Sequence, residues 1–196
     1  MVLYGHSMGG LVALGYVLSD PARPLPDLLV LSAPAIDGVV PAWKRTLAYV
    51  LSPTVPRFAV ANRIPKGALS SDPAVEAAYL ADPLAVHRTT ARLGAALLQE
   101  RNRVKRALGL GGPLPLTTYV LHGADDPVIP EWATRSLEGR PNVTRRVYPG
   151  LHHETHNEPS GAAMIDDTIA WIVRQVDSAS RRPRDDPDYP PRVASS

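Results

Sequence analysis

A glycine-rich turn lies between two strongly apolar runs at the start of the sequence and leaves few folds open. Residues 2–4 have the composition of a buried strand, and residues 11–18 are apolar enough for a buried helix. The turn between them reads Gly5-His6-Ser7-Met8-Gly9, with Gly10 following. A side chain at Gly5 or Gly9 is expected to collide with the adjoining strand or helix. The pattern therefore predicts a sharp strand-to-helix turn that carries Ser7 in a strained conformation.

Such a GxSxG turn is typical of a serine nucleophile at a helix N-terminus. Free backbone N–H groups and the helix dipole there stabilise negative charge on a carbonyl oxygen of a substrate. We therefore expect Ser7 to be a nucleophile and the N–H of Met8 to be an oxyanion donor. The plain alternative is a glycine-rich turn without chemistry. The functional reading additionally requires an acid and then a histidine later in the chain.

Two carboxylates follow an apolar run in Leu121-His122-Gly123-Ala124-Asp125-Asp126. The carboxyl end of a buried parallel strand is where α/β sheets assemble their sites, so either aspartate is a candidate acid. The alternative is that Asp125 and Asp126 cap the turn or the helix that begins near Pro130. For His122, at the end of the strand, a structural hydrogen bond is the favoured role.

Three histidines follow the last strand-like run, at His152, His153 and His156. A metal site competes with a catalytic base here, but the HExxH spacing of helical zinc sites is absent. A general base must reach Ser7 with one ring nitrogen and a carboxylate with the other. Either His152 or His153 fits that role by its position. The order serine, acid, histidine is that of α/β-hydrolases.

The chain alternates between strand-like and helical patterns on both sides of a proline-punctuated segment. Strands are predicted at residues 27–32, 117–121 and 143–148, and helices near 131–137 and 162–176. We expect an α/β core of residues 1–36 and 113–177 with a mostly parallel sheet, a helical insertion at 37–112, and a disordered tail at 178–196.

Composition narrows the classes of partner. The 196 residues include 21 Lys and Arg against 19 Asp and Glu, a net charge of +2, without a basic cluster that alternates with aromatic residues, so nucleic acid is not an expected partner. The chain has no cysteine, which excludes disulfides and thiolate sites. No membrane span or signal peptide is recognisable, and a cytoplasmic location without cofactor or metal is expected.

Several segments together resemble bacterial monoacylglycerol lipases and lysophospholipases of the α/β-hydrolase superfamily, from Met1 to about Val176. They are Gly5-His6-Ser7-Met8-Gly9-Gly10, Leu31-Ser32-Ala33-Pro34, Tyr79-Leu80-Ala81-Asp82-Pro83-Leu84, Leu121-His122-Gly123-Ala124-Asp125-Asp126 and Tyr148-Pro149-Gly150-Leu151-His152-His153-Glu154. The resemblance implies the α/β-hydrolase fold, with Asp126 as the acid and His153 as the base. Within residues 37–112, apolar side chains gather among prolines, so we expect a helical lid whose underside receives the acyl chain of a lipid ester, with transient contact to a membrane or micelle; the alternative is simple packing on the body. These side chains are Trp43, Leu47, Tyr49, Val50, Leu51 and Phe58.

The family carries roughly a hundred residues before the GxSxG turn, which is called the nucleophile elbow. Among them is a His-Gly turn that supplies the second oxyanion N–H. This sequence has only four residues there. We therefore expect either a fragment or a true start upstream of Met1. Two hypotheses follow: a serine hydrolase of carboxylic esters, and a catalytically silent α/β-hydrolase fragment or binding module.

Overall fold

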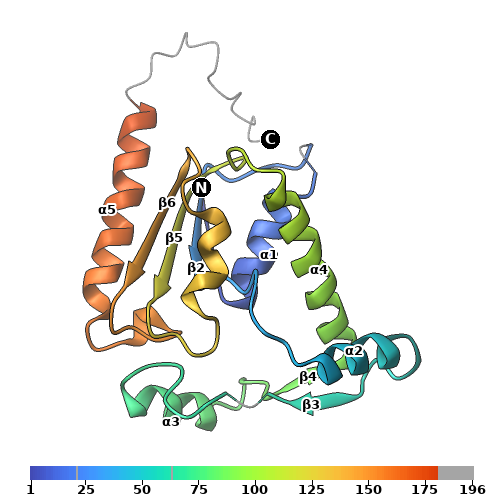
Figure 1. Ribbon diagram of the computed structural model, residues 1–196. Helices are drawn as coiled ribbons and strands as arrows, with labels where there is room; N and C mark the ends of the chain where they lie inside the picture. Colours follow the sequence, from blue (N-terminus) through green and yellow to red (C-terminus); the bar gives the residue numbers. More distant parts are fainter. Residues whose placement is uncertain (21, 63, 181–196) are drawn as a thin grey trace.

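The centre of the protein is a four-stranded parallel sheet in the order β1-β2-β5-β6 (Figure 1). The computed structural model describes residues 1–20, 22–62 and 64–180. The sheet strands are β1 (Val2–His6), β2 (Leu28–Ser32), β5 (Thr117–Gly123) and β6 (Val143–Tyr148). This arrangement, with helices on the sheet, confirms the predicted α/β class and its parallel sheet.

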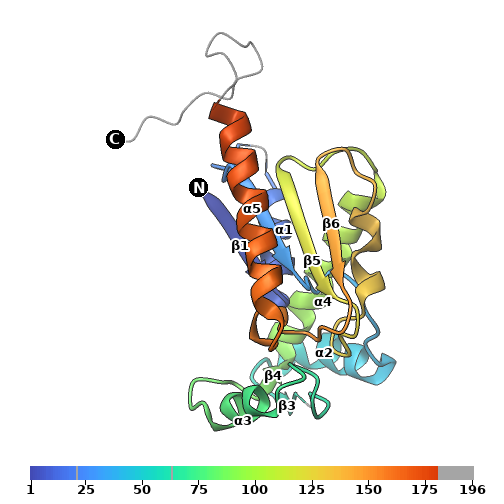
Figure 2. The same cartoon turned by 90° about the vertical axis from the view of Figure 1, so that its left-hand side faces the viewer.

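Helices cover both faces of the sheet, which is why its central strands are continuous apolar runs. One face packs against α1 (Met8–Val17) and α4 (Ala91–Gly109), and the other against α5 (Gly161–Ser180) (Figures 1 and 2). Side chains of β2 alternate between these faces. Leu29 and Leu31 join the cluster with α1 and α4, and their neighbours Leu28 and Val30 join the cluster with α5.

Strand β1 lies at one edge of the sheet. Its Leu3 packs with the α1 cluster, whereas Val2 and Tyr4 are 39% and 50% exposed. Because Val2 and Tyr4 pair in register with Leu28 and Val30, they face the side of the sheet that α5 covers. Helix α5 therefore shields β2 and β5 but leaves Val2 and Tyr4 of β1 open to solvent.

Two predicted helices differ from expectation in type or length. The segment Glu131–Leu137 forms a 3₁₀ helix, η1, and a second short one, η2, spans Thr155–Asn157. Helix α5 continues past Asp177 to Ser180, into the segment expected to be a disordered tail. The rest of that tail, residues 181–196, lies outside the described residues.

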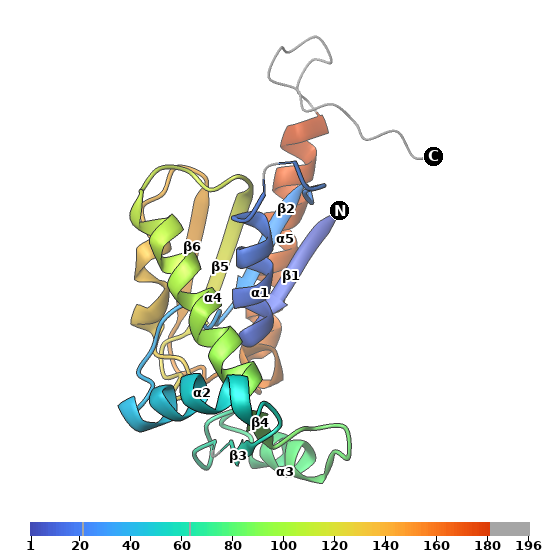
Figure 3. The ribbon, with the colours of Figure 1, turned by 90° about the vertical axis from the view of Figure 1, so that its right-hand side faces the viewer.

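The part of the inserted segment that precedes α4 lies beyond the C-terminal ends of the sheet strands (Figures 1 and 3). It contains α2 (Ala42–Thr54) and α3 (Pro73–Ala81), as expected. It also contains an antiparallel pair of short strands, β3 (Ala59–Ala61) and β4 (Arg88–Thr90), which the expectation of a helical insertion missed. We call residues 37–90 the cap.

Helix α4 belongs partly to the core, although its sequence lies within the predicted insertion. Val104 and Leu108, one turn apart, are buried in the cluster that contains Leu11 and Val120. The first half of α4 contacts α2 of the cap, as Figure 3 also shows. The same helix therefore supports the cap at one end and the sheet at the other.

Within residues 1–20, 22–62 and 64–180, no helix combines the length and the hydropathy that crossing a bilayer requires.

Candidate active site

Ser7 occupies the sharp turn between β1 and α1 with a positive φ of +52° and ψ of −119°. Non-glycine residues adopt such angles at a cost, and they cluster at functional sites. A Cβ at Gly5 would lie 2.7 Å from the carbonyl oxygen of Gly9, and one at Gly10 would lie 2.7 Å from the Cβ of Pro34. These contacts confirm the steric need for glycine at Gly5 and extend it to Gly10.

The same expectation is wrong for Gly9. A Cβ built there meets nothing within 4 Å, because the position is exposed and opens onto free space. The elbow therefore depends on close backbone approach at Gly5 and Gly10 alone.

Three side chains from distant parts of the sequence form a hydrogen-bonded chain. The Oγ of Ser7 lies 2.9 Å from Nε2 of His153, and Nδ1 of His153 lies 2.7 Å from Oδ2 of Asp126. The three residues follow β1, β6 and β5, whose carboxyl ends meet at one edge of the sheet. Because the carboxylate only accepts, Nδ1 of His153 donates and Nε2 is left to accept from the serine hydroxyl.

Asp126 is held as a carboxylate by its neighbours. Its Oδ1 accepts the backbone N–H groups of Val128 at 2.8 Å and Ile129 at 2.9 Å. Burial alone would raise the pKa of Asp126, but hydrogen bonds from His122, His153 and the backbone hold that pKa well below its ordinary value. The group is therefore negatively charged at neutral pH and orients the His153 ring.

The structure separates the neighbours that the spacing of the motifs left as alternatives. Asp125 is exposed, and its backbone N–H donates to the carbonyl of Leu151. The Nδ1 of His152 lies 3.4 Å from a carboxylate oxygen of Glu158, not near Ser7. Ser7 is thus bonded to His153 and, through it, to Asp126.

The loop that carries His153 is tied to the cap by Glu158, a residue that the sequence analysis did not single out. Oε1 of Glu158 accepts the backbone N–H of His152 at 2.8 Å, and Oε2 accepts the N–H of Ser71 at 3.0 Å. Burial would raise the pKa of Glu158, but the hydrogen bonds from Ser71 and His152 lower it. Glu158 directly follows η2, and this position carries no local pattern that could have revealed the contact.

Two main-chain hydrogen bonds reinforce this connection. The N–H of His153 donates to the carbonyl of Ala68 at 3.3 Å, and that of Glu154 donates to Leu69 at 2.8 Å. The cap segment and the histidine loop therefore run together as one unit beside Ser7.

His6, within the elbow itself, also contacts the site. Its ring centre lies 4.8 Å from that of His153 and 5.5 Å from that of His156, and its Nδ1 lies 3.1 Å from the Ser32 hydroxyl. Burial, followed by the proximity of His153 and His156, lowers the pKa of His6 to about 4. This ring is therefore neutral at pH 7 and adds no positive charge beside His153.

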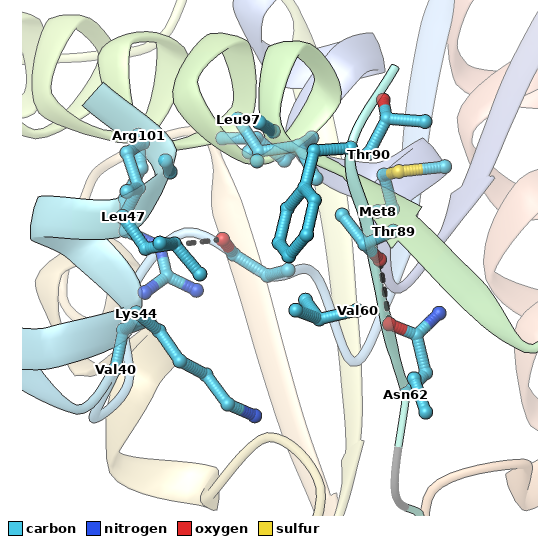
Figure 4. Close-up of a pocket in the computed structure, with 18 of the residues that line it drawn as sticks. Met8, Val40, Lys44, Leu47, Val60, Asn62, Thr89, Thr90, Leu97 and Arg101 are labelled. Atoms are coloured by element: carbon cyan, nitrogen blue, oxygen red, sulfur yellow. Dashed lines mark hydrogen bonds between the residues drawn. The ribbon is translucent and has the colours of Figure 1, made fainter. Parts of the chain in front are cut away.

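A cavity of about 400 Å³ opens between the cap and helix α4 (Figure 4). It begins at Met8, next to Ser7, and at Ile129, near Asp126. Its wall is mostly apolar, and polar groups are contributed by Lys44, Arg101 and the hydrogen-bonded pair Thr89 and Asn62. The apolar lining residues include Leu11, Leu47, Phe58, Val60, Leu97 and Leu98.

Across the part of the chain that the structure describes, no group of three or more His, Asp or Glu side chains is arranged to hold a metal ion.

Comparison with known proteins places the chain among α/β-hydrolases. A family model described as "Serine aminopeptidase, S33" matches residues 1–160. The chain is 38% identical over 183 residues to a monoacylglycerol lipase of Mycolicibacterium smegmatis, covering 89% of this chain and 62% of the relative. It is 26% identical over 181 residues to a putative monoglyceride lipase of Schizosaccharomyces pombe, covering 88% of this chain and 47% of that protein.

Solved structures give the same fold. The monoacylglycerol lipase of Paleococcus ferrophilus superposes with a TM-score of 0.79 at 25% identity, over 88% of this chain and 68% of that one. A soluble variant of monoglyceride lipase from Saccharomyces cerevisiae superposes with a TM-score of 0.71 at 19% identity, over 86% of this chain and 59% of that one. The chain spans about 62% of the Mycolicibacterium relative. It belongs to the Hydrolase_4 family of serine aminopeptidase type and has the α/β-hydrolase fold.

Proposed function

We propose that this protein is a serine hydrolase that cleaves carboxylic esters through an acyl-enzyme, with Ser7 as nucleophile, His153 as base and Asp126 as the orienting acid. The observation that carries the proposal is the continuous chain of hydrogen bonds from Ser7 through His153 to Asp126, at 2.9 and 2.7 Å. This is the geometry by which a triad is recognised whatever its position in the sequence.

The proposed reaction begins when the Oγ of Ser7 attacks the ester carbonyl carbon and passes its proton to Nε2 of His153. The carbonyl oxygen becomes negatively charged and accepts the N–H of Met8, in the first turn of α1. When the intermediate collapses, His153 returns the proton to the leaving alkoxide and the acyl group stays on Ser7. A water molecule activated by His153 then releases the acid.

The cavity favours a lipid ester as substrate. Its volume of about 400 Å³ and its apolar wall suit an acyl chain whose carbonyl lies at Ser7, beside Met8. The relatives named as monoacylglycerol lipases support monoacylglycerol as the substrate, with lysophospholipid as the related choice. None of the described residues that line the cavity is acidic. The cavity therefore has no carboxylate among them that could bind the α-amino group of a peptide substrate.

The outer surface of the cap suits a transient contact with a membrane or micelle. Trp43 and Val50 of α2 are each 60% exposed, and Phe58 beside β3 is 45% exposed. Exposed apolar side chains that gather into one patch mark interaction surfaces, and these three belong to the short segment 43–58. Because Phe58 also lines the cavity, a lipid could pass from that surface towards Ser7 along one apolar path.

The second candidate is a catalytically silent α/β-hydrolase module. One observation favours it: β1, which carries the elbow, is an edge strand with Val2 and Tyr4 exposed. An elbow supported on one side only is less rigidly held than one inside a sheet, and oxyanion stabilisation depends on that rigidity.

Labelling with a fluorophosphonate, which reacts with activated serines, separates the two candidates. We expect the folded chain to be labelled at Ser7 and the variant Ser7→Ala to stay unlabelled, with hydrolysis of p-nitrophenyl butyrate following the same pattern. A folded, monomeric chain that resists the reagent supports the silent module and overturns the hydrolase.

A further inference from the structure

His122 is a completely buried histidine that the proposed reaction does not use. It is the penultimate residue of β5 and is 0% exposed. Its Nε2 lies 2.7 Å from the carbonyl oxygen of Ile129 and 3.3 Å from Oδ2 of Asp126. A buried imidazole beside a triad carboxylate calls for an account of what its ring nitrogens do.

The two neighbours decide where one proton of His122 resides. A backbone carbonyl and an ionised carboxylate can only accept hydrogen bonds, so Nε2 must carry the proton. The direct bond goes to Ile129, and the longer contact ends on Oδ2 of Asp126, the oxygen that accepts from His153.

With this contact, every acceptor site of Asp126 is accounted for. Oδ1 accepts from Val128 and Ile129, and Oδ2 faces the ring N–H groups of His153 and His122. A carboxylate has about four acceptor sites, so none is left for water. The carboxylate can neither rotate nor shift without breaking a bond.

We propose that His122 is a positioning residue for Asp126: its Nε2–H fixes the carboxylate and withdraws part of its negative charge from the bond to His153. The inference rests on the proposed function, since it assigns Asp126 to the triad. It gives His122 a specific effect on the chemistry at Ser7, beyond filling space at the end of β5.

The opposite side of the ring is held by other groups. Nδ1 of His122 lies 3.4 Å from the Thr134 hydroxyl, which accepts a hydrogen bond from Nε of Arg145 at 3.0 Å. Arg145 is paired in turn with Glu131 and Glu138. The charged groups around His122 are therefore Asp126 on one side and, through Thr134, the Arg145 cluster on the other.

Two isosteric amides separate the Nε2 donor from the bulk of the ring. In His122→Gln the amide nitrogen reaches about as far as Nε2 and can donate to Ile129 and Asp126, whereas in His122→Asn the shorter amide reaches only the Nδ1 position. Asn is expected to lower kcat/KM on p-nitrophenyl butyrate about tenfold, mainly through kcat, as loss of an orienting partner does at other sites. The Gln variant is expected to keep most of the parent kcat/KM.

The pH profile gives a readout that a space-filling role would not change. Without the donor, Asp126 presents more negative charge to His153 and favours its protonated form, so the acid limb of kcat/KM in the Asn variant moves up by about half a pH unit. The Gln variant keeps the parent profile. As a control, Thr134→Val perturbs the same ring from the Nδ1 side and is expected to lower the melting temperature without moving the acid limb.

Nuclear magnetic resonance of ¹⁵N-histidine protein tests the same contact without turnover. We expect His122 Nε2 to be protonated at pH 7, and the low-field proton between His153 and Asp126 to be displaced in the Asn variant but not in the Gln variant. Equal effects of Asn and Gln, or an acid limb moved by Thr134→Val, would overturn the proposal. A parent chain that fluorophosphonate does not label would overturn the hydrolase instead, and the resonances would still decide the role of His122.

Discussion

Glu158 and Ser71 lie 87 positions apart in the sequence, yet the Ser71 backbone N–H donates to Oε2 of Glu158 at 3.0 Å. Ser71 belongs to the cap, and Glu158 ends the loop that carries His153. The carboxylate is 1% exposed and also accepts from the N–H of His152 and the hydroxyl of Ser70. The cap and the base of the proposed triad are therefore held by one buried side chain.

Glu158→Gln is expected to destabilise the fold by about 1–3 kcal/mol, because the amide nitrogen cannot accept and leaves a buried donor unpaired. The folded-state pKa of Glu158 lies below its ordinary value of 4.5, so its contribution is complete above that pH and declines as the pH falls towards the folded-state pKa. Urea unfolding at pH 7 and at successively lower pH should show that the difference in the free energy of unfolding between the parent and Glu158→Gln becomes smaller. A constant difference at all pH values contradicts this role.

Ser7→Ala should abolish ester hydrolysis, with a loss of roughly 10⁴ to 10⁶ in kcat, as for other triad serines. The melting temperature should change little, because the substitution removes one oxygen atom at a partly exposed position. Hydrolysis of p-nitrophenyl butyrate and thermal unfolding measure the two effects. Activity within tenfold of the parent would exclude Ser7 as the nucleophile.

The proposed triad predicts different effects of substitutions at adjacent residues. His153→Ala and Asp126→Asn should inactivate, because each breaks a hydrogen bond of the chain that ends at Ser7. His152→Ala, Asp125→Asn and His156→Ala should each keep most of the activity, since none of these side chains is bonded to the triad. An inactive His152→Ala beside an active His153→Ala would reverse the assignment.

The cap should open before the sheet does. Helices α2 and α3 contribute a single buried residue, Ala48, whereas the second half of α4 places Val104 and Leu108 in the core. Hydrogen exchange is expected to be faster in α2 and α3 than in β2 and β5, with the amides around Val104 protected like those of the strands. Protection of α2 equal to that of β2 would show a cap that is packed rigidly on the body.

Filling the cavity at Gly94 should change the preference for acyl length. A Cβ there would lie 3.5 Å from the Cβ of Ala48, an ordinary contact, so Gly94→Ala serves as a matched control that α4 tolerates. Gly94→Leu places a larger side chain into the cavity and should lower kcat/KM for long-chain p-nitrophenyl esters relative to the butyrate. An unchanged ratio would place the acyl chain elsewhere.

Local features of the sequence were sufficient for the elbow and the sheet. The uninterrupted apolar run at residues 28–31 is enough to predict a strand that is buried on both faces. The crowding at Gly5 involves Gly9 and Gly10, which are only a few positions away. The absence of crowding at Gly9 depends on the direction of one bond, which the motif does not specify. The order of serine, acid and histidine could likewise be read from spacing alone.

The family resemblance implied Asp126 and His153, but only the tertiary structure shows the contacts that separate them from their neighbours, and only it decided where the cap ends. Asp125 and Asp126 are adjacent and chemically alike, so their roles depend on how the loop after β5 turns and on the partners that meet it there. Helix α4 has one amphipathic pattern throughout, and the sheet beneath its second half assigns that half to the core. Glu158 acquires its partners from a segment 87 positions away, and contacts of that range leave no mark on local sequence patterns.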